Sequence, residues 1–144
     1  MKSIKYFFEF VAVISLFAIF KLLGIKIASS IGSILGEFFG PLFRSEAIIK
    51  ANIKTAFGSI DEYKQKEIIK GMWSNIGRTF AEYIFLKDFR FNKVKSGHMK
   101  INGTKYLDQI KKSGKPVIFY SGHFANFELM AMELDKSGIK CAAI

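Results

Sequence analysis

Hydrophobic positions are concentrated at the start of the chain. An uninterrupted apolar run covers Phe10–Phe20, eleven residues bounded by Glu9 and Lys21. A helix that crosses a bilayer needs about 20 residues, and Tyr6–Leu23 supplies eighteen if Lys21 extends its ammonium group to the interface. The pattern therefore favours a retained membrane anchor over residues 1–24. The alternative is a cleaved signal peptide, since the start is basic and small residues follow the apolar run.

The next segment, residues 25–44, has the period of an amphipathic helix. One face carries large apolar residues: Ile27, Ile31, Ile34, Leu35, Phe38, Phe39 and Leu42. The other face carries polar residues: Ser29, Ser30, Ser33 and Glu37. Pro41 is expected to end or bend this helix. We expect the helix to lie in the membrane interface beside the anchor. The alternative is an ordinary helix that packs on the core.

Two more helices are expected between residues 45 and 88. Ser45 is a plausible N-cap of the first, and Gly58 a plausible stop. The second begins near Asp61 and carries one broad apolar stripe: Ile68, Ile69, Met72, Trp73, Ile76, Phe80 and Ile84. Such a stripe is typical of core, so no ligand is assigned to it.

After residue 88 the pattern changes to short alternating or apolar runs. Strands are expected at Phe89–Lys95, His98–Ile101 and Pro116–Ser121, and from Ile139 onward. Helices are expected between the later strands, so this part predicts an α/β fold with a partial mixed or parallel sheet flanked by helices. The last expected strand is cut short, and we therefore expect residues 45–144 to be the N-terminal part of a larger α/β domain.

The sequence GHFANFE follows the expected strand Pro116–Ser121 and carries the candidate chemistry. His123 falls in the turn after the strand, where open α/β sheets bind their ligands. Asn126 is a good N-cap, which places Glu128 in the first helical turn, a favourable position for a carboxylate. An ionised Glu128 would orient the imidazole of His123 while His123 takes a proton from a hydroxyl group. Gly122 would let a substrate approach the backbone closely.

On spacing alone, His123 and Glu128 could also be two unrelated surface residues. The attacking hydroxyl group is expected to belong to a substrate, because Ser121 lacks the setting of a nucleophile elbow. Two histidines far apart predict no metal site.

The composition limits the partners. The formal net charge of +10 favours anionic partners such as phospholipid, a phosphorylated lipid or an acidic carrier protein. Nucleic acid is not expected, because no recognition module is present. The chain has 16 phenylalanines and half of its residues are hydrophobic, which favours contact with a membrane. The single cysteine, Cys141, excludes an intrachain disulfide.

Several segments together carry a resemblance to a known family. GHFANFE resembles the H-x4-D/E motif of membrane-associated acyltransferases. The order of a basic anchor, ANIKTAF, WSNIGRTFAEY and GKPVIFYSGHFANFEL is similar to that of the lipid A biosynthesis acyltransferases, the lauroyl- or myristoyl-type enzymes of Gram-negative inner membranes. The resemblance spans nearly all 144 residues. Members are about twice this length, so it implies an N-terminal half and leaves activity of the truncated chain an open question.

The resemblance implies transfer of a fatty acyl group from acyl carrier protein to a hydroxyl group of a Kdo-bearing lipid A precursor. It implies His123 and Glu128 as the catalytic pair, Gly122 and Asn126 as substrate-binding residues, and neither cofactor nor metal. The expected location is the inner membrane, with the soluble part facing the cytoplasm. Two alternatives stay open: a glycerophospholipid acyltransferase, and a non-catalytic basic membrane protein that binds anionic lipid.

Overall fold

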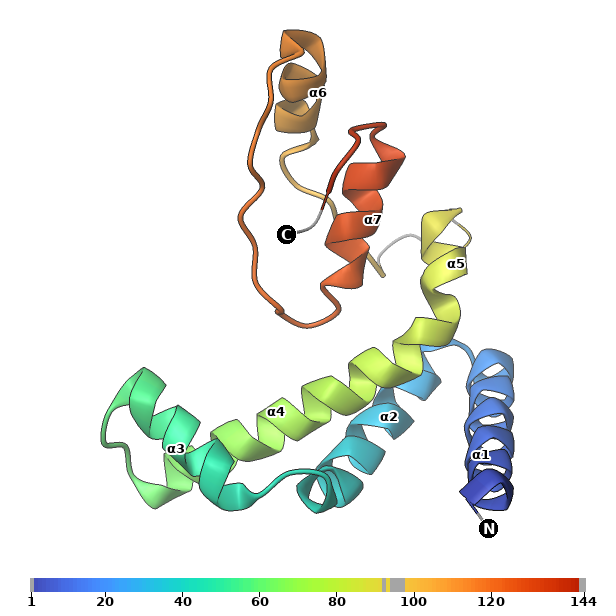
Figure 1. The fold of residues 1–144 in the computed structure, drawn as a ribbon, viewed down its shortest axis with the longest axis vertical. Helices are drawn as coiled ribbons and strands as arrows, with labels where there is room; N and C mark the ends of the chain where they lie inside the picture. Colours follow the sequence, from blue (N-terminus) through green and yellow to red (C-terminus); the bar gives the residue numbers. More distant parts are fainter. Residues whose placement is uncertain (1, 92, 94–97, 143–144) are drawn as a thin grey trace. The chain divides into compact units, whose positions relative to one another are not determined.

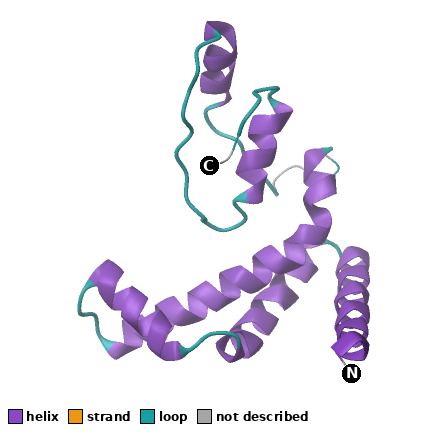
Figure 2. Ribbon diagram, in the orientation of Figure 1, coloured by secondary structure: helices purple, strands orange, loops and turns teal. Residues whose placement is uncertain are grey.

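A computed structural model describes residues 2–91, 93 and 98–142 of the chain (Figure 1). Within this range every regular element is a helix (Figure 2). The elements are α1 Lys2–Leu23, α2 Ile25–Phe39, η1 Gly40–Leu42, α3 Glu46–Phe57, α4 Glu62–Glu82, η2 Tyr83–Phe85, α5 Leu86–Arg90, α6 Thr104–Ser113 and α7 Glu128–Lys136. The chain divides into two compact units, Met1–Ile84 and Phe85–Ile144. The finer division at residues 24 and 44 stays a prediction from the sequence.

The expected α/β fold is wrong for the residues that the structure describes, because they contain no strand and no sheet. Phe89 and Arg90 belong to α5, and the other segments read as strands, His98–Ile101, Pro116–Ser121 and 139–142, have no regular structure. Residues 92, 94, 95, 143 and 144 of these expected strands lie outside the described range.

The physical reason is visible at Pro116–Ser121, the most strand-like of these segments. Among the described residues, no backbone hydrogen bond joins it to another segment. A strand is held by hydrogen bonds to a neighbouring strand, so an apolar β-branched run without such a neighbour cannot form one. Ile118 and Tyr120 are 97% and 100% exposed, although an apolar run of this kind predicts burial.

The helix predictions for the N-terminal half are confirmed. α2 ends at Phe39 and continues as the 3-10 turn η1, which contains Pro41. α3 has Ser45 as its N-cap and ends at Gly58, whose φ of 71° suits glycine. α4 is capped by Asp61, whose carboxylate accepts a hydrogen bond of 2.8 Å from the backbone N–H of Lys64.

Close packing of α2 against α4 dominates the N-terminal unit. Gly32, Gly36 and Gly40 repeat at intervals of four and so share one face of α2. This face meets α4 so closely that a Cβ on Gly36 would stand 2.9 Å from the Cα of Gly77, and closer still to the carbonyl oxygen of Trp73. Small residues at such spacing let helix backbones approach one another, as they do between helices in membranes.

Polar side chains run along one side of this α2–α4 contact, since Ser29, Ser33 and Glu37 repeat at intervals of four on α2. Ser29 donates a hydrogen bond of 2.9 Å to Glu82, the hydroxyl groups of Ser33 and Ser74 lie 2.6 Å apart, and Lys70 lies 3.6 Å from Glu37. Residue numbers rise along α2 as they fall along α4, so the two helices are antiparallel. The contact thus combines close backbone approach with hydrogen bonds that a displaced helix could not make.

The two faces of α2 differ in burial. The small and polar face is the one turned toward α4: Ala28, Gly32 and Ser33 are its buried residues. Much of the large apolar face stays exposed, with Ile34 at 66% and Phe38 at 74%. Exposed apolar residues on one helix face are compatible with the interfacial position predicted from the sequence, which stays a prediction.

The core of the N-terminal unit forms where α3 meets α4. Trp73, 7% exposed, packs with Ile49 and Ile53 of α3. Residues at the edge of this cluster complete it: Ile60, Ile68, Ile69 and Met72. The predicted core stripe of α4 is therefore confirmed at its N-terminal half, whereas Ile76 and Phe80, further along, are 47% and 41% exposed.

α1 contains one stretch, Ile4–Leu23, that is long and apolar enough to cross a membrane. Its mean hydropathy is 2.0, and only 6% of the apolar window is buried within the protein. A core helix of a soluble protein would be mostly buried. The low burial of this stretch therefore favours a membrane anchor, and a signal sequence stays the alternative.

Candidate active site

The candidate residues come from the loop that precedes α7 and from the first turn of α7. Glu128 is the first residue of this nine-residue helix, as predicted. The N-cap is Phe127 and not Asn126, and no side chain caps the helix. Asn126 nevertheless starts the helical hydrogen bonding, because its carbonyl oxygen accepts a bond of 3.2 Å from the N–H of Leu129.

His123 lies at the centre of a tight turn. The N–H of Phe124 donates a 2.9 Å hydrogen bond to the carbonyl oxygen of Gly122, which closes a three-residue turn around His123. The imidazole is exposed and contacts the ring of Phe127 edge to face, with 4.2 Å between ring centroids. In the described structure no hydrogen bond or ion pair joins His123 to Glu128. The ring is thus positioned by an aromatic neighbour on one side and is open to a ligand on the other.

Backbone strain lies between the two candidate catalytic residues. Ala125 has a φ of 46° and is the only residue other than glycine with positive φ in the described range. The left-handed conformation costs an alanine about 1–2 kcal/mol. Strained residues of this kind cluster at functional sites, where the surrounding structure holds them in place.

The ring of Phe124 lies against Gly122 in this turn. A Cβ at this position would stand 2.6 Å from a ring carbon of Phe124. From the sequence, Gly122 is expected to let a substrate approach the backbone closely. The structure adds that the turn itself leaves no room for a larger residue unless the ring of Phe124 moves.

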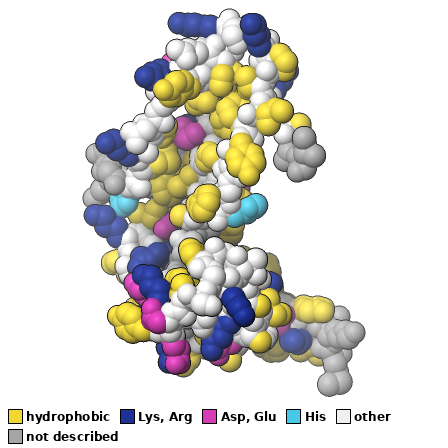
Figure 3. Space-filling model, turned by 90° about the vertical axis from the view of Figure 1, so that its left-hand side faces the viewer, with side chains coloured by type: hydrophobic (Ala, Val, Ile, Leu, Met, Phe, Trp, Pro, Cys, Tyr) yellow, Lys and Arg dark blue, Asp and Glu magenta, His cyan; other side chains and the backbone are white. Residues whose placement is uncertain are grey.

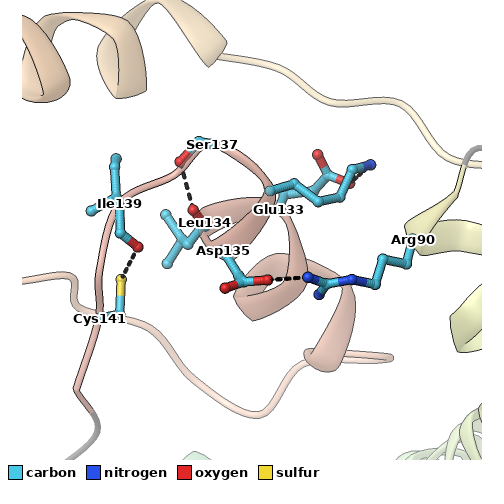
Figure 4. A network of polar contacts seen from close by, with 8 residues as sticks. Arg90, Glu133, Leu134, Asp135, Ser137, Ile139 and Cys141 are labelled. Atoms are coloured by element: carbon cyan, nitrogen blue, oxygen red, sulfur yellow. Dashed lines mark hydrogen bonds and ion pairs between the residues drawn. The ribbon is translucent and has the colours of Figure 1, made fainter.

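α7, which carries Glu128, is fixed to α5 through its C-terminal half (Figure 4). Arg90 of α5 pairs with Asp135 of α7 at 2.5 Å, and Ser137 donates a hydrogen bond of 2.6 Å to the carbonyl oxygen of Leu134. The pair is exposed, and pairs of this kind contribute about 0–1 kcal/mol. Both contacts involve the C-terminal half of α7, away from Glu128 in its first turn.

A cavity of about 520 Å³ lies beside the candidate residues, within the C-terminal unit. Gly122 and Asn126, the predicted substrate-binding residues, line it, and His123 and Glu128 do not. Most of the other lining side chains are apolar and come from α6, α7 and the loops around them: Met99, Ile101, Leu107, Phe124, Phe127, Leu129, Met130 and Leu134. Figure 3 shows hydrophobic side chains gathered in a hollow of this unit, in the upper part of the view.

The contribution of α6 to this cavity was not predicted from the sequence. Leu107 and Ile110 stand three residues apart among lysines, a pattern that marks the apolar side of a helix. Leu107 does line the cavity. His98, the second histidine, is half-buried and is not among the lining residues. No group of three potential metal ligands occurs among the residues that were placed.

Comparison with known proteins identifies the family. The model of the bacterial lipid A biosynthesis acyltransferases matches residues 1–144. The chain belongs to this family. The resemblance predicted from the sequence is therefore confirmed, and the match covers the candidate site as well as the N-terminal helices. Searches of curated proteins and of solved structures gave no match.

Membership gives the general function of this lipid A acyltransferase. An enzyme of the family transfers an acyl group in lipid A biosynthesis, so its substrates are an acyl donor and a lipid A precursor. An apolar cavity beside a loop that carries an exposed histidine is compatible with such substrates, because a fatty acyl chain needs apolar walls and an acyl transfer to a hydroxyl group needs a base.

Proposed function

We propose that this lipid A acyltransferase transfers a fatty acyl group from the thioester of acyl carrier protein to a hydroxyl group of a lipid A precursor. His123 is the general base and Glu128 its orienting partner. Gly122 and Asn126 contact the substrate. The thioester itself supplies the electrophile, so the reaction requires no cofactor or metal.

One observation carries this proposal: the segment GHFANFE, which holds His123 and Glu128, also contributes lining residues to an apolar cavity. Its volume of about 520 Å³ lies within the roughly 300–1,000 Å³ that is usual for small-molecule sites. A fatty acyl chain held there would bring its carbonyl end to the loop Gly122–Glu128, because Gly122 and Asn126 belong to both the loop and the cavity wall.

The reaction follows from the chemistry of these groups. His123 takes the proton of the acceptor hydroxyl group, and the oxygen attacks the thioester carbonyl carbon. The carbon–sulfur bond breaks as the new ester forms, and the imidazolium returns the proton to the departing thiolate. Glu128 stabilises the imidazolium while it carries the charge. Catalytic hydrogen bonds are often long in free enzymes and tighten with substrate, so the absence of a direct His123–Glu128 bond fits the free state.

The charge of α6 supports an acidic acyl donor. Lys105, Lys111 and Lys112 lie on α6, and Lys100 and Lys115 flank it, against a single carboxylate in the helix, Asp108. Of these lysines Lys100 lines the cavity, as does one carboxylate, Glu133. A basic helix that contributes to an apolar cavity suits a carrier protein that is acidic and delivers an acyl chain.

The proposed location is the inner membrane, with the site on the cytoplasmic side. The apolar stretch Ile4–Leu23 supports membrane attachment, and the proposed donor, acyl carrier protein, supports the cytoplasmic side. The phosphorylated precursor and the anionic phospholipids around it would both be attracted by the net positive charge of the chain.

The test is acyl transfer from lauroyl carrier protein to a tetra-acylated lipid A precursor, with the chain in membranes. His123→Ala is expected to lower the rate by at least about 100-fold, the usual contribution of a general base. His98→Ala is the matched control, because it removes the other histidine of the same unit and should leave the rate unchanged.

A second pair of variants tests the carboxylate. Glu128→Gln should lower the rate, whereas Glu62→Gln, at the first position of α4, should not. Equal rates for His123→Ala and the unmodified chain would refute the proposed role of the histidine. Transfer to a glycerolipid acceptor and not to the lipid A precursor would refute the proposed acceptor.

A further inference from the structure

The N-terminal unit contains a second cavity, of about 430 Å³, between α1, α2 and α4. Every residue that lines it is apolar or glycine; the walls include Leu16 and Phe20 of α1, Leu35 of α2, and Ile76 and Phe80 of α4. The cavity is a consequence of the α2–α4 contact, since glycines bring the two backbones together and leave no side chains to fill the space beside them.

The lining restricts what can occupy this cavity. Among the lining side chains only Trp73 carries a polar group, a buried indole N–H without a hydrogen-bond partner in the described part of the chain. A charged group would lose its hydration without gaining a charged partner there, which is costly. An empty cavity of this size would forgo dispersion contacts along all of its walls. Engineered apolar cavities of about 150 Å³ already bind small hydrocarbons, and this one is larger. The occupant is therefore hydrocarbon.

The position of α1 identifies the source of that hydrocarbon. Leu16 and Phe20 lie within the stretch that can cross a membrane, about 10 Å and about 5 Å along the helix from Leu23 at 1.5 Å per residue. That depth is the acyl-chain region of one leaflet. Lys26 follows the stretch and lies where anionic headgroups would attract it.

We infer that the cavity between α1, α2 and α4 holds one acyl chain of a membrane phospholipid. The acyl chain would pack between α1 and the α2–α4 pair, and would so fix the membrane anchor to the rest of the unit. The inference rests on the membrane location proposed above and not on the catalytic roles of His123 and Glu128.

α4 provides a specific reporter. Its sequence is rich in charged and polar residues, so α4 is less suited than α1 to direct contact with the bilayer. Labelling of Ile76 or Phe80 by a probe in the middle of an acyl chain would thus report entry of that chain into the cavity. Labelling of Val11 and Ile14, which are exposed on α1 and do not line the cavity, reports ordinary contact with the bilayer.

The experiment places the full chain in vesicles of phosphatidylethanolamine and phosphatidylglycerol with a trace of phospholipid that carries a diazirine in one acyl chain. After irradiation, mass spectrometry maps the labelled residues. Label is expected on α1 and on Ile76 or Phe80. Leu35→Trp, which fills the cavity, should lower the label on α4 by about tenfold, equivalent to about 1.4 kcal/mol of lost binding. Ile34→Trp changes the exposed neighbour and should not alter it.

Each other outcome has a definite meaning. Label on α1 with none on α4 overturns the inference, as does label on α4 that Leu35→Trp leaves unchanged, because the probe then reaches α4 from outside the cavity. Leu16→Trp fills the cavity from α1 and replaces Leu35→Trp if that variant loses helicity. His123→Ala should leave the labelling intact, so loss of acyl transfer and loss of lipid binding are separate results.

Discussion

The two compact units of this lipid A acyltransferase are built on different principles. In the N-terminal unit, helices approach until backbone meets backbone, and Trp73, Ile49 and Ile53 form a buried cluster. In the C-terminal unit neither α6 nor α7 has a buried residue, and the candidate catalytic residues lie in a loop and a first helical turn. The comparison shows that scaffold and chemistry are separated along the chain: the closely packed part carries no candidate catalytic residue, and the part with the chemistry is open.

The largest expected effect is the loss of stability in the N-terminal unit when a single methyl group is added at the α2–α4 contact. Gly36→Ala should destabilise the N-terminal unit by more than about 3 kcal/mol, since overpacking costs roughly 1–3 kcal/mol where side chains can yield, and here the obstacle is backbone. Thermal unfolding followed by the fluorescence of Trp73, the only tryptophan, would measure it.

Gly71→Ala is the control for this substitution. Gly71 lies in α4, the helix against which Gly36 of α2 packs, but has no atom within 4 Å of an added Cβ. Alanine there should stabilise the helix by about 0.5–1 kcal/mol, because it lowers the conformational entropy of the unfolded chain. A loss of stability in both variants would mean that glycine matters to the N-terminal unit for another reason than close packing.

A smaller difference is expected between one polar pair from each unit. Ser33 is buried, and its hydroxyl group also donates to Glu37, so a double-mutant cycle of Ser33→Ala and Ser74→Ala should give a coupling of about 1 kcal/mol. The exposed pair of Arg90 and Asp135 should give less than about 0.5 kcal/mol. Trp73 fluorescence reports the first pair, and hydrogen exchange of α7 the second. Equal couplings would contradict the contrast between the units.

The candidate catalytic residues should matter little to stability. His123→Ala and Glu128→Gln are expected to change the free energy of unfolding by no more than about 0.5 kcal/mol, because neither side chain has a hydrogen bond or ion pair in the described structure. Hydrogen exchange of α7 in both variants would measure this. Marked loss of protection would show that the pair holds the loop together and would make any loss of activity ambiguous.

The smallest expected effect is the response of the N-terminal unit to acid. Hydrogen bonding to Lys50 and its positive charge hold the pKa of Glu46 below its ordinary value of 4.5. A lowered carboxyl pKa contributes stability above the unfolded-state value, and this contribution is lost as the pH falls through the folded-state value. The melting temperature should therefore fall slightly below about pH 4.5, and less so in Glu46→Gln. High salt should diminish the difference, because the pair is exposed.

The sequence by itself determined the helices and the motif. Asp61 caps α4 and Gly58 ends α3 through local hydrogen bonds, and Ser45 stands at the N-cap position of α3 without a side-chain hydrogen bond. The local sequence pattern therefore located α3 and the start of α4 correctly. The segment GHFANFE likewise gave Glu128 its place at the start of α7 and supplied the family resemblance that the family match confirmed.

Only the tertiary structure decided which surfaces meet. The strands expected from residues 89 to 142 depended on partners that a local pattern cannot supply, and within the described residues none is formed. The amphipathic pattern of α2 left open whether its large apolar face meets the membrane or the core. The buried face is the one with Gly32 and Ser33, because glycine allows an approach that no apolar side chain permits. Local patterns fix hydrogen bonds within a few residues, whereas close contact depends on the shape of both partners.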